Sequence, residues 1–173
     1  MIELTDPKWR ELQGNYGSGV QIARLIAKAQ AGAPMEEWYE DLFQGLCHQE
    51  TVSQAAYAAA PHLVKIAAAP GAPRMDLLIL LGACYANSGS PIPTDLEEEW
   101  HEPTRQAFPL PAELEEDWRA SARQAIPLLA ELLTEPRPEV ELRYLFACLA
   151  AFHGYQWLAK KLETFDVDTD LEE

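Results

Sequence analysis

A helical hairpin occurs twice in this chain, and the repetition limits how the chain can fold more than any other feature of its sequence. The segment AAPHLVKIAAAP, residues 59–70, aligns without a gap with AIPLLAELLTEP, residues 125–136. After a two-residue shift in the turn, RMDLLILLGAC overlays PEVELRYLFAC. Each unit is a helix with an internal proline, a turn marked by proline, and a second apolar helix that ends in Ala-Cys. Such pairs cannot bury their apolar faces alone, so the pattern predicts stacked helical pairs.

The equivalent prolines and cysteines make this prediction specific. Pro61 matches Pro127, and Cys84 matches Cys148. A proline inside a helix removes one backbone hydrogen bond and bends the helix, which suits a helix that curves along its neighbour. We therefore expect both prolines inside the first helix of an antiparallel pair, and both cysteines buried at equivalent positions.

Apolar residues at helical spacing predict further helices on both sides of the repeat. The predicted helices cover residues 7–13, 18–31, 35–46, 51–69, 74–87, 114–132, 139–152 and 155–164. No segment shows the alternation of a β-strand. We therefore expect an all-α fold of seven or eight helices, arranged in pairs as a right-handed α-α superhelix. One domain over residues 1–165 is expected, followed by an acidic tail over residues 166–173.

Two segments of the N-terminal half form a motif: YGSG, and LCHQETVSQAAYAAAPHLVKIA, residues 46–67. Both resemble a bacterial family of small HEAT-like, armadillo-type helical repeat proteins. The residues that match the family motif are Trp9, Leu12, Tyr16, Gly17, Leu46, His48, Gln49, Thr51, Val52, Ala55, Ala59, Pro61, Leu63 and Ala67. Glu50 stands where the motif has glycine. The resemblance covers residues 9 to about 84 and implies a HEAT-like fold, without implying a reaction.

The charge of the chain is concentrated in two segments. The net charge is −15, from 28 acids and 13 bases. Residues 95–117 contain nine acids and one base, and residues 163–173 contain six acids and no base. Nucleic acids and anionic membranes are disfavoured as partners, because their phosphates require clustered Lys and Arg. A basic protein partner is compatible with this distribution.

The first acidic segment overlaps a predicted loop over residues 88–111, which has five prolines and no sustained periodicity. Aromatic side chains among carboxylates combine contact area with long-range attraction of a basic protein. The candidate partner-binding residues are Glu97, Glu98, Glu99, Trp100, Phe108 and Trp118. The alternative is that the tryptophans pack on the helical body and the carboxylates only solvate a linker.

The polar segment His48-Gln49-Glu50-Thr51 precedes a predicted helix that carries His62. One interpretation is a metal-binding or enzymatic site formed by His48, Glu50 and His62. The interpretation that we favour is a polar structural joint, in which His48 or Gln49 bonds to backbone groups between two helices. We expect no cofactor and no metal ion.

The remaining features bear on where the protein works and on its chemistry. Three cysteines without a CxxC spacing are typical of buried thiols in a reducing cytoplasm. The N-terminus has no secretory pattern, and the longest apolar run is about half of the roughly 20 residues needed to cross a bilayer. No nucleophile or phosphate-binding motif occurs. We therefore expect a cytoplasmic, non-enzymatic protein-protein interaction module, of immunity or regulatory type, whose partner is a basic toxin, nuclease or similar protein.

Overall fold

The structure is a computed structural model, and it describes residues 1–49, 51–88 and 108–164. Its α-helices are α1 Gly19–Gln30, α2 Tyr39–Leu46, α3 Gln54–Ala67, α4 Arg74–Ala86, α5 Glu115–Leu132, α6 Glu139–Phe152 and α7 Gln156–Thr164. Three short 3-10 helices are η1 Pro7–Arg10, η2 Met35–Glu37 and η3 Ala112–Leu114. Two antiparallel ladders pair β1 Gln13–Gly14 with β2 Gly17–Ser18, and β3 Cys47–His48 with β4 Thr51–Val52. The prediction of a mostly helical chain is confirmed.

The two ladders show that the expectation of a chain without strands was wrong. Each strand has only two residues, so the sequence cannot show the alternation by which strands are recognised. Two helix boundaries also differ. The helix expected over residues 35–46 divides at Trp38, whose φ is −147°. The helix expected over residues 7–13 is a single 3-10 turn, capped by Asp6, whose carboxylate accepts the Lys8 N–H at 2.8 Å.

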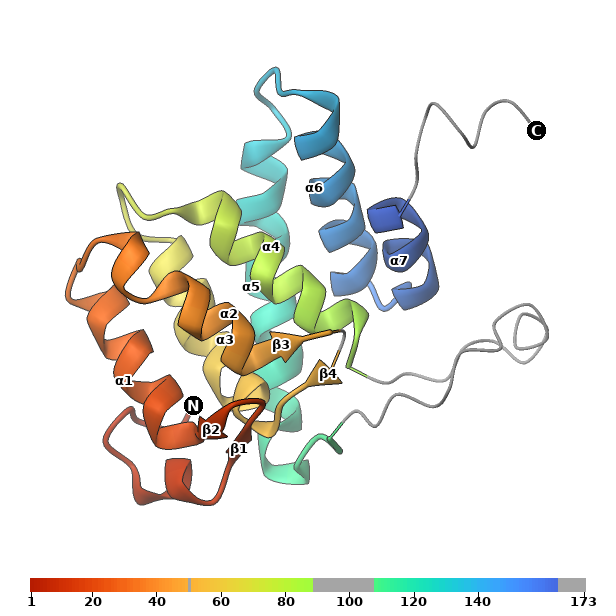
Figure 1. The fold of residues 1–173 in the computed structure, drawn as a ribbon. Coiled ribbons are helices and arrows are strands. Elements are labelled where there is room, and N and C mark those ends of the chain that lie inside the picture. The colour runs from red at the N-terminus through yellow and green to blue at the C-terminus, as the bar shows by residue number, and fades with distance from the viewer. Residues whose placement is uncertain (50, 89–107, 165–173) are drawn as a thin grey trace.

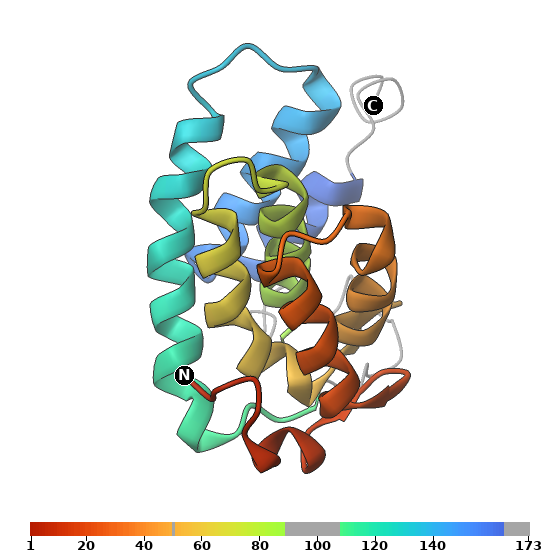
Figure 2. The ribbon, with the colours of Figure 1, turned by 90° about the vertical axis from the view of Figure 1, so that its left-hand side faces the viewer.

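The helices form two layers (Figure 1), which are also visible after a quarter turn (Figure 2). Helices α1, α3 and α5 lie side by side in one layer, and α2, α4 and α6 lie in the other, with α7 next to α6. Gln30 on α1 contacts His62 on α3 at 3.4 Å, and the Tyr39 hydroxyl on α2 donates to the Asp76 carbonyl on α4 at 3.1 Å. The hairpins α1–α2, α3–α4 and α5–α6 therefore lie one beside the next.

The repeated residues occupy the places that the alignment predicts. Pro61 lies inside α3 and Pro127 inside α5. Cys84 on α4 is 1% exposed and Cys148 on α6 is 3% exposed. These predictions are confirmed. Helices α4 and α6 approach each other closely at this level. A Cβ added to Gly82 would lie only 2.3 Å from the Cys148 sulfur, which shows how little space separates the two helices.

Candidate functional site

The polar joint at His48 is held by a chain of side chains that starts on α2. The Gln44 amide nitrogen donates to the Glu40 carboxylate at 2.9 Å, and the Gln44 oxygen lies 2.5 Å from His48 Nδ1. The Glu40 carboxylate only accepts hydrogen bonds, so the NH2 group of Gln44 faces Glu40 and the Gln44 oxygen faces His48. Because that oxygen is an acceptor, His48 donates from Nδ1. The expected partner of His48 was a backbone group, and the observed partner is instead the side chain one helical turn earlier. Gln49 forms the turn of the β3–β4 ladder with a φ of 45°, and Glu50 lies outside the described residues.

The β1–β2 turn packs on this joint, so the two halves of the family-like motif meet in space. The Tyr16 ring meets the His48 ring edge-on, with centroids 4.7 Å apart. The Asn15 backbone N–H donates to the Gly45 carbonyl at 3.0 Å, and its side-chain amide donates to the Thr51 carbonyl at 2.9 Å. Sequence reasoning missed Asn15, although its place in the GNYG turn was a usable signal. Tyr16 is 61% exposed, so this corner is accessible.

His62 does not join His48 in a common site. It is 2% exposed, its Nε2 donates to the Ile2 carbonyl at 2.8 Å, and Gln30 contacts its Nδ1. Burial lowers the pKa of His62, so the neutral ring is favoured. Both ring nitrogens thus tie the N-terminal segment and α1 to α3. In the part of the chain that the structure describes, no three His, Cys, Asp or Glu side chains are placed to hold a metal ion.

All three cysteines are buried, and at two of them the surroundings disfavour the thiolate. Cys47 is 5% exposed, and Cys84 and Cys148 are less exposed still. A hydrogen bond with Cys47 and burial together raise the pKa of the Cys84 thiol, and burial raises the pKa of Cys148 to about 12. Because the thiolate is the reactive form, these two thiols are structural.

Two of the candidate partner-binding residues belong to the helical body. Trp118 is 6% exposed; its ring stacks on Tyr85 with centroids 3.7 Å apart and meets Tyr57 edge-on at 4.9 Å. The Tyr57 hydroxyl donates to the Phe108 carbonyl at 2.9 Å. Trp118 was a candidate for partner binding, and its burial against α3 and α4 instead agrees with the alternative that this tryptophan packs on the helical body. Burial also raises the pKa of Tyr57 to about 12.

The other members of that set, Glu97, Glu98, Glu99 and Trp100, lie outside the described residues. Phe108 is partly buried at the start of the segment that leads into α5. The C-terminal end of the acidic loop is attached to the core, because the Tyr57 hydroxyl donates to the Phe108 carbonyl. At the other end, the Ser88 hydroxyl donates to the Tyr85 carbonyl of α4 at 2.9 Å.

A second acidic surface lies on the described residues, and sequence reasoning did not single it out. Residues 35–46 carry four acids and no base, and all four are exposed. We call these residues, Glu36, Glu37, Glu40 and Asp41, the α2 acidic face. Helices α1 and α3 of the neighbouring layer together carry three bases and no acid. The signal was present in the sequence as MEEWYED.

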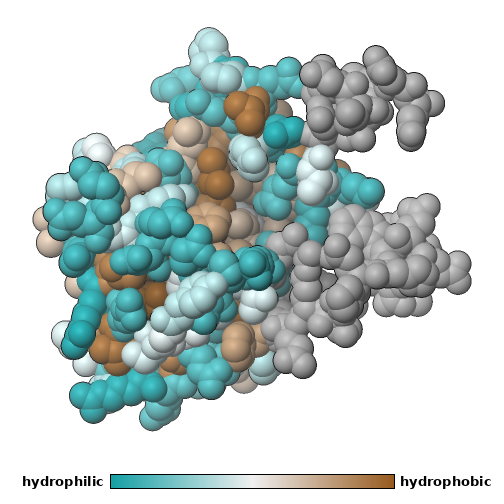
Figure 3. Space-filling view, viewed as in Figure 1, coloured by the Kyte–Doolittle hydropathy of each residue, from teal (hydrophilic) through white to brown (hydrophobic). Residues whose placement is uncertain are grey.

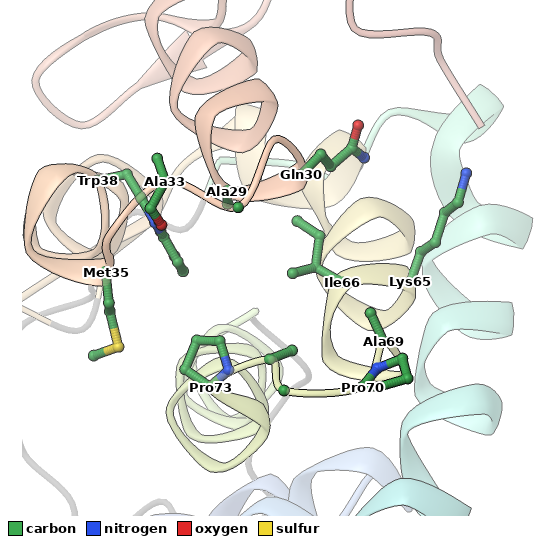
Figure 4. Close-up of a pocket in the computed structure, with 13 residues that line it drawn as sticks. Ala29, Gln30, Ala33, Met35, Trp38, Lys65, Ile66, Ala69, Pro70 and Pro73 are labelled. Carbon is green, nitrogen blue, oxygen red and sulfur yellow. The ribbon is translucent and has the colours of Figure 1, made fainter.

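A hollow of about 730 Å³ lies where the ends of α1 and α3 meet the turn before α4. Trp38 and Ile66 point into it, whereas Gln30 and Lys65 point away from it (Figure 4). The Trp38 ring nitrogen donates to the Ala33 carbonyl at 3.1 Å, so the ring presents carbon to the hollow. The lining is suited to apolar contact and brings no pair of catalytic groups together.

No helix of the described residues is both long and apolar enough to cross a membrane. No protein-family model, curated protein or solved structure matches this chain, so the resemblance to small HEAT-like proteins remains a hypothesis.

Proposed function

We propose that this protein is a non-enzymatic interaction module that binds a basic protein through acidic surfaces, as an immunity-type or regulatory protein would. The observation that carries the proposal is the α2 acidic face: four exposed carboxylates within one short segment, without a base among them. The acidic loop, which follows α4 in the sequence, provides a second source of negative charge. Such surfaces accelerate the approach of a basic protein and disfavour acidic competitors.

The chemistry of the described residues supports binding rather than catalysis. His62 and Trp118 are used by the core, and His48 is oriented by Gln44 at a surface corner. A general base must lie within hydrogen-bond reach of the proton that it abstracts, such as that of a neighbouring nucleophile. His48 has a glutamine and a tyrosine ring beside it, and neither activates a nucleophile or holds a metal ion. The alternative, a metal-binding protein or enzyme using His48, Glu50 and His62, therefore has less support.

The proposal extends to architecture and location. Adjacent hairpins in two layers are compatible with a right-handed HEAT-like superhelix, which offers a long surface for a partner. Three free cysteines fit a reducing cytoplasm, where thiols remain unpaired.

The test uses the product of the neighbouring gene as the partner and measures association and dissociation rates at about 0.05 and 0.5 M salt. The variant E36Q/E37Q/E40Q/D41N removes the charge of the α2 acidic face and keeps the size of each side chain. We expect its association rate to fall by about tenfold at low salt and to approach that of the wild type at high salt. The control E113Q/E116Q removes two charges, one on η3 and one in the first turn of α5, and should change the rate by less than about twofold.

The proposal fails if the quadruple variant and the wild type associate at equal rates at both salt concentrations. It also fails if the neighbouring product proves to be acidic and binds through this face.

A further inference from the structure

A small hollow lies where the β1–β2 turn meets the start of α1 and the second half of α2. Asp41 and Gln44 line it from α2, Gln21 lines it from α1, and Tyr16 and Gly17 line it from the turn. Its volume is about 310 Å³. Sites for small molecules usually enclose about 300–1,000 Å³, so this hollow suits a single side chain better than a larger ligand. On the face seen in Figure 3, hydrophilic side chains gather where α2 lies.

Asp41 gives the hollow its charge, because it is the one acid or base among the lining residues. It is exposed, and no residue of the described ranges bonds to its carboxylate. Gln44 brings a second carboxylate to the edge of the hollow, since its amide nitrogen donates to Glu40 at 2.9 Å. The N-terminus of α1 contributes about half a positive charge, which the full negative charge of Asp41 outweighs. The hollow therefore favours a cation.

The Tyr16 ring gives the hollow an aromatic wall. The His48 ring meets it edge-on, with centroids 4.7 Å apart, and Tyr16 remains 61% exposed, so a side chain from outside can reach the ring. Gly17 has a φ of 143°, a conformation that favours glycine, and a Cβ there would lie 2.9 Å from the Gln21 side-chain oxygen. A larger residue at this position would therefore crowd the hollow.

The Gln44 amide is already oriented before any ligand binds. Its nitrogen is held by Glu40 and its oxygen by His48. An amide oxygen has two lone pairs, so this oxygen can accept one further hydrogen bond. A carboxylate, an amide oxygen and an aromatic ring thus lie around one small space.

We propose that this hollow binds an arginine side chain of the basic partner, an inference that rests on the proposed function and names the residue type that the partner presents. A guanidinium group has five N–H donors in one plane, so it pairs with Asp41 and donates to Gln44 while its face lies on Tyr16. Lysine is a compact point charge and cannot combine these contacts. Glu36 and Glu37 do not line the hollow, so they attract the partner at longer range, whereas the hollow holds its arginine.

The test needs no partner protein. Arginine blocked as its acetyl and methylamide derivative is added to the isotope-labelled full chain at about 0.15 M salt, and amide NMR signals are followed; blocked lysine is the comparison. We expect saturable shifts at Gly17 and Gly45, and a dissociation constant at least about threefold lower for arginine than for lysine. Asp41→Asn should raise the constant for arginine by at least about fivefold, and Tyr16→Leu by about threefold. The matched control is Glu36→Gln, on the same acidic face but outside the hollow, with an expected change below about twofold.

Far-UV circular dichroism of every variant establishes that the helices are retained. The proposal is overturned if the signals of the hollow do not shift, if arginine and lysine bind equally, or if Asp41→Asn binds arginine as the wild type does. Equal weakening by Asp41→Asn and Glu36→Gln also overturns it, because that result indicates diffuse attraction rather than a site. Arginine binding without association of the neighbouring gene's product would support the hollow and refute the proposed function. Association of that product without arginine binding would refute the hollow alone.

Discussion

The close approach of α4 and α6 at Gly82 makes one substitution informative. In Gly82→Ala, the new Cβ would lie 2.3 Å from the Cys148 sulfur, 2.8 Å from its Cβ and 3.0 Å from its Cα. Carbon atoms pack at about 3.5–4.0 Å, so the two helices must separate by roughly 1 Å. Overpacking of this kind costs about 1–3 kcal/mol, and the backbone atom at 3.0 Å places this case at the upper end.

The gain in helix propensity from glycine to alanine offsets about 1 kcal/mol of that cost. We therefore expect Gly82→Ala to lower the free energy of unfolding by about 2 kcal/mol. Urea denaturation followed by circular dichroism measures it, because an m-value of about 2 kcal/mol per molar converts that loss into a shift of about 1 M in the midpoint.

Gly45→Ala is the matched control. Gly45 is also a buried helical glycine, but its added Cβ would meet the Ile22 side chain, with Cδ1 at 2.4 Å and Cγ1 at 3.7 Å. A terminal methyl can rotate away for about 0.5–1.5 kcal/mol, which the propensity gain nearly cancels. Adding Cys148→Ala to Gly82→Ala removes the closest atom and should recover about 1 kcal/mol in a double-mutant cycle. A Gly82→Ala protein as stable as the wild type, or no coupling with Cys148→Ala, would refute the close approach.

Three further outcomes are expected. Trp118→Ala should cost about 3–5 kcal/mol, seen as a large fall in the thermal midpoint, because it empties the ring-stacking cluster; a loss below about 1 kcal/mol would contradict its burial. His62 has a lowered pKa in the folded state, so its contribution to stability is present above the unfolded pKa of about 6.5 and is lost as the pH falls through the folded pKa. Urea midpoints of His62→Gln should accordingly fall less than those of the wild type between neutral and mildly acidic pH; parallel curves would count against this. The variant E97Q/E98Q/E99Q should slow association with a basic partner mainly at low salt, and rates equal to the wild type at both salts would leave these residues as a solvated linker.

The fold was predictable to the extent that it depends on local periodicity and on the repeat. The helices that contain Pro61 and Pro127 were expected because apolar residues recur at helical spacing around each proline. The β1–β2 and β3–β4 ladders were not predictable, because two residues carry no pattern. Asn15, in the turn of the first ladder, donates hydrogen bonds to Gly45 and Thr51, which both lie far from it in the chain.

The candidate site was less predictable, because the function of a side chain depends on what packs against it. The residues around the acidic loop were chosen for their composition, yet Trp118 is stacked on Tyr85 in the core. His48 and His62 are fourteen positions apart and were weighed as one site, but each is held by different neighbours. The sequence did contain the α2 acidic face, although only the structure shows that all four carboxylates are exposed together.

By itself, then, the sequence determined the helices, the repeated hairpin and the overall excess of negative charge, since these follow from spacing and composition along the chain. Only the tertiary structure decided which aromatic rings are buried and which repeat positions are exposed. The physical reason is that burial and charge separation arise between segments distant in sequence. Gly82 and Phe146 occupy equivalent positions in the repeat, and they differ because one faces a following hairpin and the other faces solvent.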